Sequence, residues 1–380
     1  MPTRSSPVAR LDAIAHARQV VLHERSTTGR GLVAPWIERS WQRCLAMGHE
    51  PRQPVTFAPL SSAAMRRARE ISHGLTQAAR PVLAELGQAL ASTRYFAILT
   101  DAQGVVVDVN GPIDRSDRRA DLITRIGADL SESCVGTTAI GAALSELQPV
   151  WLHRGEHFFG DTSSYSCAGA PLFGPSGEVV GMLDLTGVDT PERPELKHLV
   201  VQSARTIENI LALRQQHRLL LRLNWPGCRL GDDSDGLLGL DADGRVCTSN
   251  SAARAMLPAL APAGGAPAAP MHASELFALP VDQMFDAAGR RDGPISIPLW
   301  SGLLLHALVS NATDMPEALA GLRAGIPAPP AQGSPRRLKD IETALIRKAV
   351  DEARGNVALA ASRLGVSRAT VYRKLGLPRA

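Results

Sequence analysis

The chain has 380 residues, more than one hydrophobic core usually holds, so we expect several domains. Its 44% hydrophobic content excludes a chain that is disordered throughout. No apolar run reaches the roughly 18–20 residues that span a bilayer, and the first ten residues lack the apolar stretch of a secretory signal. We therefore expect a cytoplasmic protein without membrane contact. Its five scattered cysteines, without a C-x-x-C pair, predict reduced thiols rather than disulfides or a zinc site.

The positive charge is concentrated in the last residues of the sequence. Residues 337–380 hold ten Lys and Arg against four Asp and Glu, a net charge of +6 in a chain whose total is +4. A basic segment beside a near-neutral remainder indicates a polyanionic partner, most simply nucleic acid. Charge alone leaves open a basic tail that only aids solubility.

Residues 1–92 are predicted to be mainly helical. Ile37, Trp41 and Leu45 fall at positions i, i+4 and i+8, which places them on one face of a helix. Residues 61–92 show a similar spread of Leu, Ala and Ile, without strand alternation. We expect N-terminal helices before the first sheet.

The pattern changes at Tyr95 to that of an antiparallel α+β domain, which we place at residues 93–192. Two apolar hairpins are separated by a segment of helical character, and a turn containing Gly joins the strands of each hairpin. The predicted strands are 95–100 with 105–109 and 167–173 with 178–186, and the predicted helix is 134–147.

A connecting helix is predicted at residues 193–223, because Pro194 suits a helix start and apolar residues then recur near a spacing of 3.5. Its stripe fits equally a coiled-coil dimer helix and a helix packed on its own domain. Residues 224–312 repeat the hairpin theme and predict a second α+β domain. Its expected elements are strands 236–240, 245–250, 295–300 and 303–310, helix 251–257, and an Ala/Pro/Gly-rich loop at 258–270. Residues 313–336 form the expected linker.

Residues 337–380 predict an all-α helix-turn-helix domain. Asn356 is a good N-cap for a helix over residues 357–364, and Gly365 permits the left-handed backbone that ends it. Ser367 then caps a third helix over residues 368–376. The short connection makes the two helices cross steeply, which is the helix-turn-helix geometry.

The third helix has the side chains that reading DNA requires. Val371 and Leu375 are four residues apart and are expected to face inward, which leaves a basic and polar face outward. The alternative is a small helical bundle with a solvated basic face. The predicted DNA-binding residues are Asn356, Ser367, Arg368, Thr370, Tyr372, Arg373 and Lys374.

Several segments carry a family resemblance. GNVALAASRLGVSRATVYRKL at residues 355–375 resembles the Fis-type helix-turn-helix of bacterial enhancer-binding regulators. RSWQRC at 39–44, SESCVGTTAIG at 131–141, GEHF at 155–158 and CAGAP at 167–171 resemble the sensor half of acetoin-catabolism-type activators. The resemblance implies a GAF-like small-molecule sensor over the first sheet and a PAS-like module over the second. Thr138 stands where the family usually has Asn.

The resemblance and the sheet-and-helix pattern together predict a pocket within residues 93–192 for a small-molecule effector. Whether Asp184 faces that pocket or points away stays open. His153 and His157 are four apart, but no third ligand stands out nearby, so we expect no metal. We also expect no catalytic residue and no cofactor. The expected ligand-binding residues are Cys134, Thr137, Thr138, His157 and Cys167.

One departure from those activators concerns their central ATPase. Such a domain needs the phosphate-binding motif G-x-x-x-x-G-K-[ST], and none of the four lysines here, at positions 197, 339, 348 and 374, lies in it. The sequence predicts a ligand-responsive, sequence-specific transcriptional regulator that acts without ATP hydrolysis. We expect a homodimer on an inverted-repeat operator, with RNA polymerase as a possible further partner. The alternatives are a thiol-dependent methionine sulfoxide reductase or redox sensor, and a Fis-like nucleoid-structuring protein.

Overall fold

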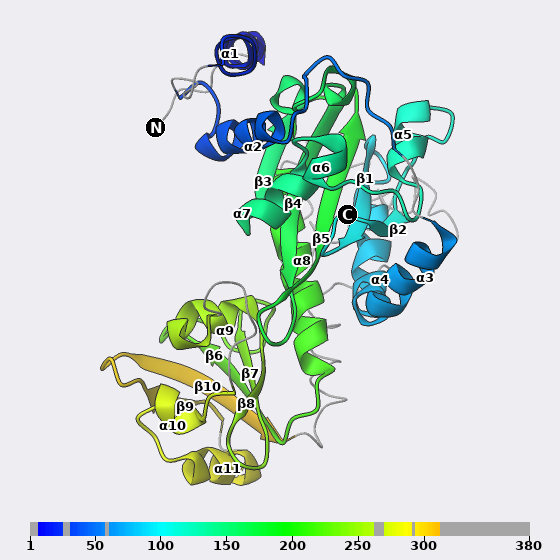
Figure 1. Cartoon of the computed structure of the whole chain (residues 1–380). Coiled ribbons are helices and arrows are strands. Elements are labelled where there is room, and N and C mark those ends of the chain that lie inside the picture. Colours follow the sequence, from blue (N-terminus) through cyan, green and yellow to red (C-terminus); the bar gives the residue numbers. More distant parts are fainter. Residues whose placement is uncertain (1–6, 26–30, 58–60, 262–269, 291–292, 312–380) are drawn as a thin grey trace, which may run out of the picture. The chain divides into compact units, whose positions relative to one another are not determined.

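The computed structural model describes residues 7–25, 31–57, 61–261, 270–290 and 293–311 (Figure 1). All of them belong to the first of two compact units, which spans residues 1–322. The predicted linker, the predicted helix-turn-helix and most of the loop predicted at 258–270 lie outside the described residues. None of the described helices is long and apolar enough to cross a membrane.

Helices precede the first sheet, as the apolar spacing predicts. Pro35 occupies the first turn of α2, where its missing N–H costs no hydrogen bond, and Ile37 and Trp41 on its inner face are buried. The hydroxyl of Ser61 caps α3 by accepting from the amide of Ala64. The elements of this region are α1 (Pro7–Arg18), the π-helical turn η1 (Gln19–His23), α2 (Pro35–Ala46), α3 (Ser62–Ile71) and α4 (His73–Ala89).

The first sheet has five antiparallel strands in the order β2-β1-β5-β4-β3, so β5 is central. Both predicted hairpins are confirmed. In the first, Gly104 adopts a φ of +88°, and the carboxylate of Asp101 accepts from the amides of Gln103 and Val105 across the turn. The strands are β1 (Tyr95–Asp101), β2 (Val106–Asn110), β3 (Val150–His153), β4 (Tyr165–Phe173) and β5 (Val179–Val188).

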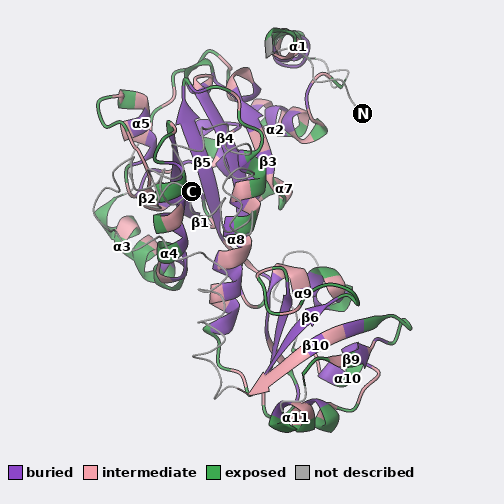
Figure 2. Cartoon of the chain, turned by 180° about the vertical axis from the view of Figure 1, so that it is seen from behind, coloured by how far each residue is buried: buried purple, intermediate pink, exposed green. Residues whose placement is uncertain are grey.

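Helices cover both faces of this sheet, which explains why its central strands are buried (Figure 2). Leu183 and Leu185 of β5 pack on the face covered by α4 and α8 (Leu196–Leu213). The alternate residue Met182 packs on the opposite face. That face carries α5 (Arg118–Ile123), α6 (Glu132–Val135) and α7 (Ala139–Glu146), with the 3-10 turns η2 (Arg154–Glu156) and η3 (Gly160–Thr162) nearby in the chain.

The connecting helix differs from the prediction in length. It ends at Leu213, and the last residues assigned to it form strand β6 (Leu219–Asn224) instead. Leu219, Leu221 and Leu223 alternate onto one face of the strand, and Leu221 also falls on the 3.5-residue spacing that runs through Ile207 of the helix. The buried stripe of α8 packs against its own domain, on α4 and β4. This packing favours a helix packed on its own domain over a coiled-coil dimer helix.

A second antiparallel sheet has the order β8-β7-β6-β10-β9. Asn250 caps α9 by accepting from the amide of Ala253, as its position between strand and helix predicts. The remaining elements are β7 (Gly236–Leu240), β8 (Val246–Ser249), α9 (Ser251–Met256), η4 (Pro258–Leu260), α10 (Ala273–Leu276), α11 (Val281–Arg290), β9 (Ile295–Pro298) and β10 (Leu304–Asn311). The expected α+β class, with helices and two antiparallel sheets, is confirmed.

Candidate functional site

A small cavity lies on the α7-covered face of the first sheet. Its volume is about 30 Å³, and it is lined by residues from β1, β4, β5, α7 and the segment after η2. Most of its wall is apolar, formed by side chains such as Ile98, Leu130 and Ile140. Its polar lining residues are Thr138, His157, Thr162, Tyr165, Cys167, Asp184 and Thr186.

Four of these polar side chains form a connected chain. The Nδ1 atom of His157 lies 2.9 Å from the carbonyl oxygen of Arg154, which fixes Nδ1 as the donor and leaves Nε2 as the acceptor. Nε2 lies 3.5 Å from Sγ of Cys167, and the hydroxyl of Thr186 lies 3.2 Å from the same sulfur. That hydroxyl donates to Oδ2 of Asp184, while Oδ1 of Asp184 has no hydrogen-bond partner.

Burial sets the protonation states in the cavity. It raises the pKa of Asp184 to about 7 and lowers the pKa of His157 to about 4. Burial, followed by the nearby carboxyl of Asp184, raises the pKa of Cys167 well above its usual value. Near neutral pH the imidazole is therefore uncharged and the thiol keeps its proton.

The loop that brings His157 to the cavity is held by the N-terminal helices. The guanidinium of Arg18 donates to the carbonyls of Gly155, His157 and Phe158, at 2.8 Å for Gly155 and 2.9 Å for Phe158. The indole N–H of Trp41 donates to the carbonyl of Glu156 at 2.9 Å. We call these contacts the N-terminal clamp.

The Glu156 side chain points toward the same helices. Its Oε1 accepts from Arg10 at 2.9 Å, and its Oε2 accepts from the backbone amide of His153 at 2.7 Å. Burial raises the pKa of Glu156 to about 7, although Arg10 acts in the opposite direction. A carboxyl that titrates close to neutral pH therefore lies beside the N-terminal clamp.

A second network joins α2 to α6 and α7. Arg43 donates to both carboxylate oxygens of Glu132, at 2.7 and 3.0 Å, and to Glu146 at 2.8 Å. The hydroxyl of Ser40 contacts Glu132 and lies 2.8 Å from the hydroxyl of Thr137. Two segments that carry the family resemblance, residues 39–44 and 131–141, thus meet in space.

The structure brings three of the five expected ligand-binding residues to the cavity, namely Thr138, His157 and Cys167. Thr137 is buried beside it, in contact with Ser40 and 3.5 Å from Sγ of Cys44. Cys134 is exposed and lies outside the cavity lining, with its thiol 3.2 Å from the carboxylate of Asp129.

The expected set lacked Thr162, Tyr165 and Thr186 as lining residues, and it left the direction of Asp184 open. A signal for Asp184 and Thr186 was present in the sequence. Met182, Asp184 and Thr186 alternate along β5 with Leu183 and Leu185, so the carboxyl and hydroxyl share one face of the strand. Asp184, whose direction the sequence left open, lines the cavity.

The described residues do not bring three His, Cys, Asp or Glu side chains together as a metal site would require. Nδ1 of His153 is 2.8 Å from the hydroxyl of Ser166, and Nδ1 of His157 faces a backbone carbonyl. Both imidazoles therefore have protein partners, a β4 hydroxyl for His153 and a carbonyl of η2 for His157.

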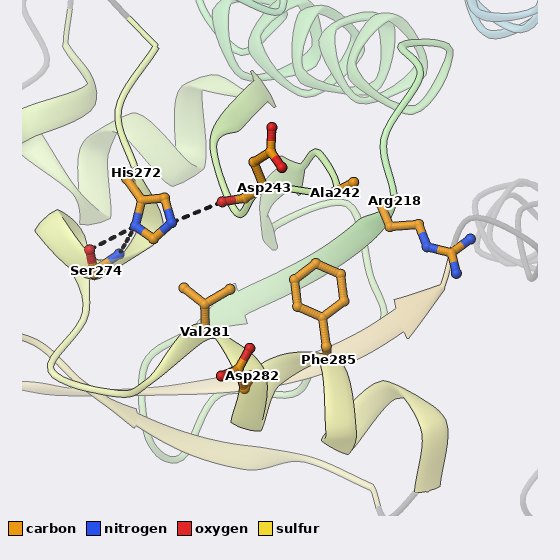
Figure 3. A pocket seen from close by; sticks show the side chains of 8 residues that line it. All are labelled: Arg218, Ala242, Asp243, His272, Ser274, Val281, Asp282 and Phe285. Carbon is orange, nitrogen blue, oxygen red and sulfur yellow. Dashed lines mark hydrogen bonds between the residues drawn. The ribbon is translucent and has the colours of Figure 1, made fainter.

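A larger and more open groove of about 550 Å³ lies beside the second sheet (Figure 3). Val281 and Phe285 of α11 line it together with the turn that carries Asp243. Nε2 of His272 is 2.9 Å from the Asp243 carbonyl, and its Nδ1 is 2.7 Å from the Ser274 hydroxyl. These contacts give His272 a role in holding the groove wall.

The expected DNA-binding residues lie outside the described residues, so only the sequence bears on them. They are Asn356, Ser367, Arg368, Thr370, Tyr372, Arg373 and Lys374.

Comparison with known proteins supports the expected resemblance. The acetoin catabolism regulatory protein of Cupriavidus necator is 31% identical over 315 residues, which are 76% of this chain and 46% of that protein. The propane 2-monooxygenase operon transcriptional activator MimR of Mycolicibacterium goodii is 29% identical over 189 residues, 47% of this chain and 30% of that protein. The chain thus spans about half, or less, of the length of these relatives.

Among solved structures, the E. coli DhaR(N)-DhaL complex matches with a TM-score of 0.44 and 16% sequence identity, covering 73% of this chain and 99% of that chain. Residues 337–376 match the bacterial regulatory proteins of the Fis family. Residues 15–209, more than half of the chain, match the family described as MimR, N-terminal domain. The chain therefore belongs to the family of regulators defined by the MimR N-terminal domain, here combined with a Fis-family segment.

Proposed function

We propose that this protein is a ligand-responsive, sequence-specific DNA-binding transcriptional regulator. The observation that carries the proposal is the Fis-family match over residues 337–376, which coincides with the basic segment for which the sequence predicts a helix-turn-helix. Relatives named as regulators of operons support the same function. Arg368, Thr370 and Arg373 are the residues we assign to base edges, and Lys374 is assigned to phosphate.

Within this proposal, the first sheet with its helices is a GAF-like effector sensor, at residues 93–192. The second sheet is a PAS-like module within residues 224–312, joined to the DNA-binding domain by a linker at 313–336. The helix between the two sheets connects them. The cavity with buried polar groups supports the sensor assignment, because small-molecule sites combine apolar walls with a few placed polar atoms.

The proposed regulation works by occupancy rather than by ATP hydrolysis. None of the four lysines of this chain lies in a phosphate-binding G-x-x-x-x-G-K-[ST] motif. Effector binding then shifts a homodimer between DNA-competent and DNA-incompetent arrangements, limited by the effector's differential affinity for the two. At its operator in the cytoplasm, such a dimer blocks RNA polymerase, recruits the ordinary form of it, or competes with a complete activator for the same site.

The cysteines give little support to a thiol-dependent reductase or redox sensor. A nucleophilic thiol needs a lowered pKa. Burial raises the pKa values of both Cys134 and Cys167. The relative affinity for different DNA sequences distinguishes a nucleoid-structuring protein from a regulator. The first binds bulk DNA and a defined operator with similar affinity, whereas the second prefers the operator.

The test is DNA binding by the full chain at an operator mapped by footprinting its own upstream region. Arg368→Ala should weaken operator binding by about 1–3 kcal/mol, whereas Lys374→Ala should weaken binding to every sequence and reduce the salt slope. Arg69→Ala removes the same charge from an exposed site on α3 and serves as the matched control. Unchanged binding by both Arg368→Ala and Lys374→Ala would overturn the assignment.

A further inference from the structure

The turn between β4 and β5 contacts the second sheet, which belongs to the same compact unit. The carbonyl of Pro175 in this turn accepts from the backbone amide of Ser249 on β8 at 2.8 Å. The guanidinium of Arg254 on α9 donates to the carbonyls of Gly174 and Ser249, at 3.4 and 2.7 Å. It also lies 5.8 Å from the ring centroid of Phe173. Arg254 is 8% exposed, so a buried charge holds the turn to the second sheet.

Glu208 of α8 joins both sides of this contact with one carboxylate. Its Oε1 accepts from the amide of Phe173, the last residue of β4, at 3.0 Å. Its Oε2 accepts from the amide of Ser251, the first residue of α9, at 3.3 Å. Burial raises the pKa of the Glu208 carboxyl, while the bonds from these two residues and the charge of Arg254 act in the opposite direction. Glu208 is 5% exposed, so losing either bond leaves a buried amide without its acceptor.

The two strands that end in this turn also form part of the cavity wall of the first sheet. Cys167 lies on β4 and Asp184 on β5, and the paired strands continue from them to the pair of Phe173 and Val179 beside the turn. Helix α8 packs on the opposite face of the sheet. A displacement of β4 or β5 at the cavity therefore reaches the second sheet along hydrogen-bonded strands, without passing through the backbone of α8.

We propose that the turn at residues 174–178, held by Glu208 and Arg254, passes a change in the first sheet to the second sheet. We call these three components the inter-sheet contact. It has two states, with the turn bonded to β8 and α9 or released from them. In the sequence, the second sheet lies between the first sheet and the Fis-family segment at 337–376. The inference rests on the proposed ligand-responsive function, and it specifies a route by which the sensor sheet acts on the rest of the chain.

The test measures whether a perturbation of the first sheet changes hydrogen exchange in the second sheet. Ile140→Ala removes a buried side chain of α7 and leaves a void in the core that this helix shares with β4 and β5. Amide exchange of the full chain is followed by mass spectrometry at pH 8. We expect Ile140→Ala to make exchange in β6 and β7 at least about tenfold faster. Exchange in β4 and β5 shows whether the substitution acts on the first sheet, and Leu152→Ala in the same core replaces it if it does not.

Glu208→Gln then breaks the bridge with little change of shape. The NH₂ group of the new side chain cannot accept a hydrogen bond, so only one of the amides of Phe173 and Ser251 keeps an oxygen acceptor. In this background we expect Ile140→Ala to change exchange in β6 and β7 by less than about twofold, which completes a double-mutant cycle. Glu195→Gln, at the exposed start of the same helix, is the matched control and should keep the full effect of Ile140→Ala.

Two results would overturn the proposal. One is unchanged exchange in β6 and β7 when the first sheet is perturbed, and the other is an undiminished effect in the Glu208→Gln background, which would assign the coupling to α8 alone. If Glu208→Gln does not fold, Arg254→Lys takes its place, because lysine keeps the charge but lacks the planar fork that reaches two carbonyls. Operator binding is measured on the same preparation. Operator binding without coupling overturns this inference alone, and coupling without operator binding overturns the regulator while supporting the inter-sheet contact.

Discussion

Asp184 makes the stability of the protein depend on pH. Its pKa is raised from 3.8 to about 7 by burial, so the folded state holds a proton that the unfolded state has released between these two values. Stability from this group is therefore largest below pH 4 and is lost as the pH rises toward 7. Asparagine, an uncharged side chain of similar shape, does not titrate and therefore does not lose stability over this pH range.

We predict that Asp184→Asn becomes progressively more stable than the native chain as the pH rises. The difference in unfolding free energy should grow by roughly 2–3 kcal/mol between pH 5 and pH 8. Glu156 and His157 titrate in both proteins, so their contributions cancel in the difference. Urea unfolding at the two pH values measures this difference in unfolding free energy. A difference that does not change with pH contradicts the raised pKa of Asp184.

Arg18 is a second residue whose contribution to the unfolding free energy can be measured by substitution. Its guanidinium serves three backbone carbonyls of the loop before and after His157, and Arg18→Ala leaves them without their donor. We expect a loss of about 2–3 kcal/mol in unfolding free energy, measured from urea midpoints. The exposed Arg69→Ala should stay within about 0.5 kcal/mol of the native value. A similar small effect for Arg18→Ala would show that the clamp contributes little.

At the scale of elements, α8 can be tested as a packed helix. Ile207 is 0% exposed and lies in the core shared with α4 and β4. Ile207→Ala should cost about 2–4 kcal/mol, with the same loss at every protein concentration, because the contact lies within one chain. The exposed His198→Ala on the same helix is the control. A loss that shrinks with increasing protein concentration would instead indicate a coiled-coil role.

The sequence predicted elements well where one periodicity dominated. The hairpins of the first sheet have alternating strands joined by turns with Gly, and both were confirmed. The boundary between α8 and β6 was wrong, because Leu221 of β6 also falls on the 3.5-residue spacing that runs through Ile207 of α8. At the cavity, the sequence identified Thr138, His157 and Cys167, which lie in the segments that carry the family resemblance. Whether Asp184 and Thr186 line the cavity depends instead on which face of β5 packs against α7. Tertiary packing decides that face, which one strand's sequence does not specify.

At the scale of the whole molecule, we predict a dimer on an inverted repeat. One recognition helix contacts too few base pairs for adequate discrimination, and a two-fold dimer matches half-sites about one helical turn apart. Light scattering should give a dimer, and an operator reduced to one half-site should bind much more weakly than the intact repeat. A monomer with full affinity for a single half-site contradicts this arrangement.

The N-terminal helices also determine where the chain can be truncated. A fragment that starts at residue 93 loses α4 from one face of the first sheet and the helix partners of Phe158 and Phe159 from another region. The newly uncovered apolar side chains form patches that favour precipitation. We expect such a fragment to be poorly soluble, and to be recovered in solution when residues 1–92 are co-expressed as a separate peptide. Residues 1–92 thus complete the hydrophobic cores of the sheet domain that follows them.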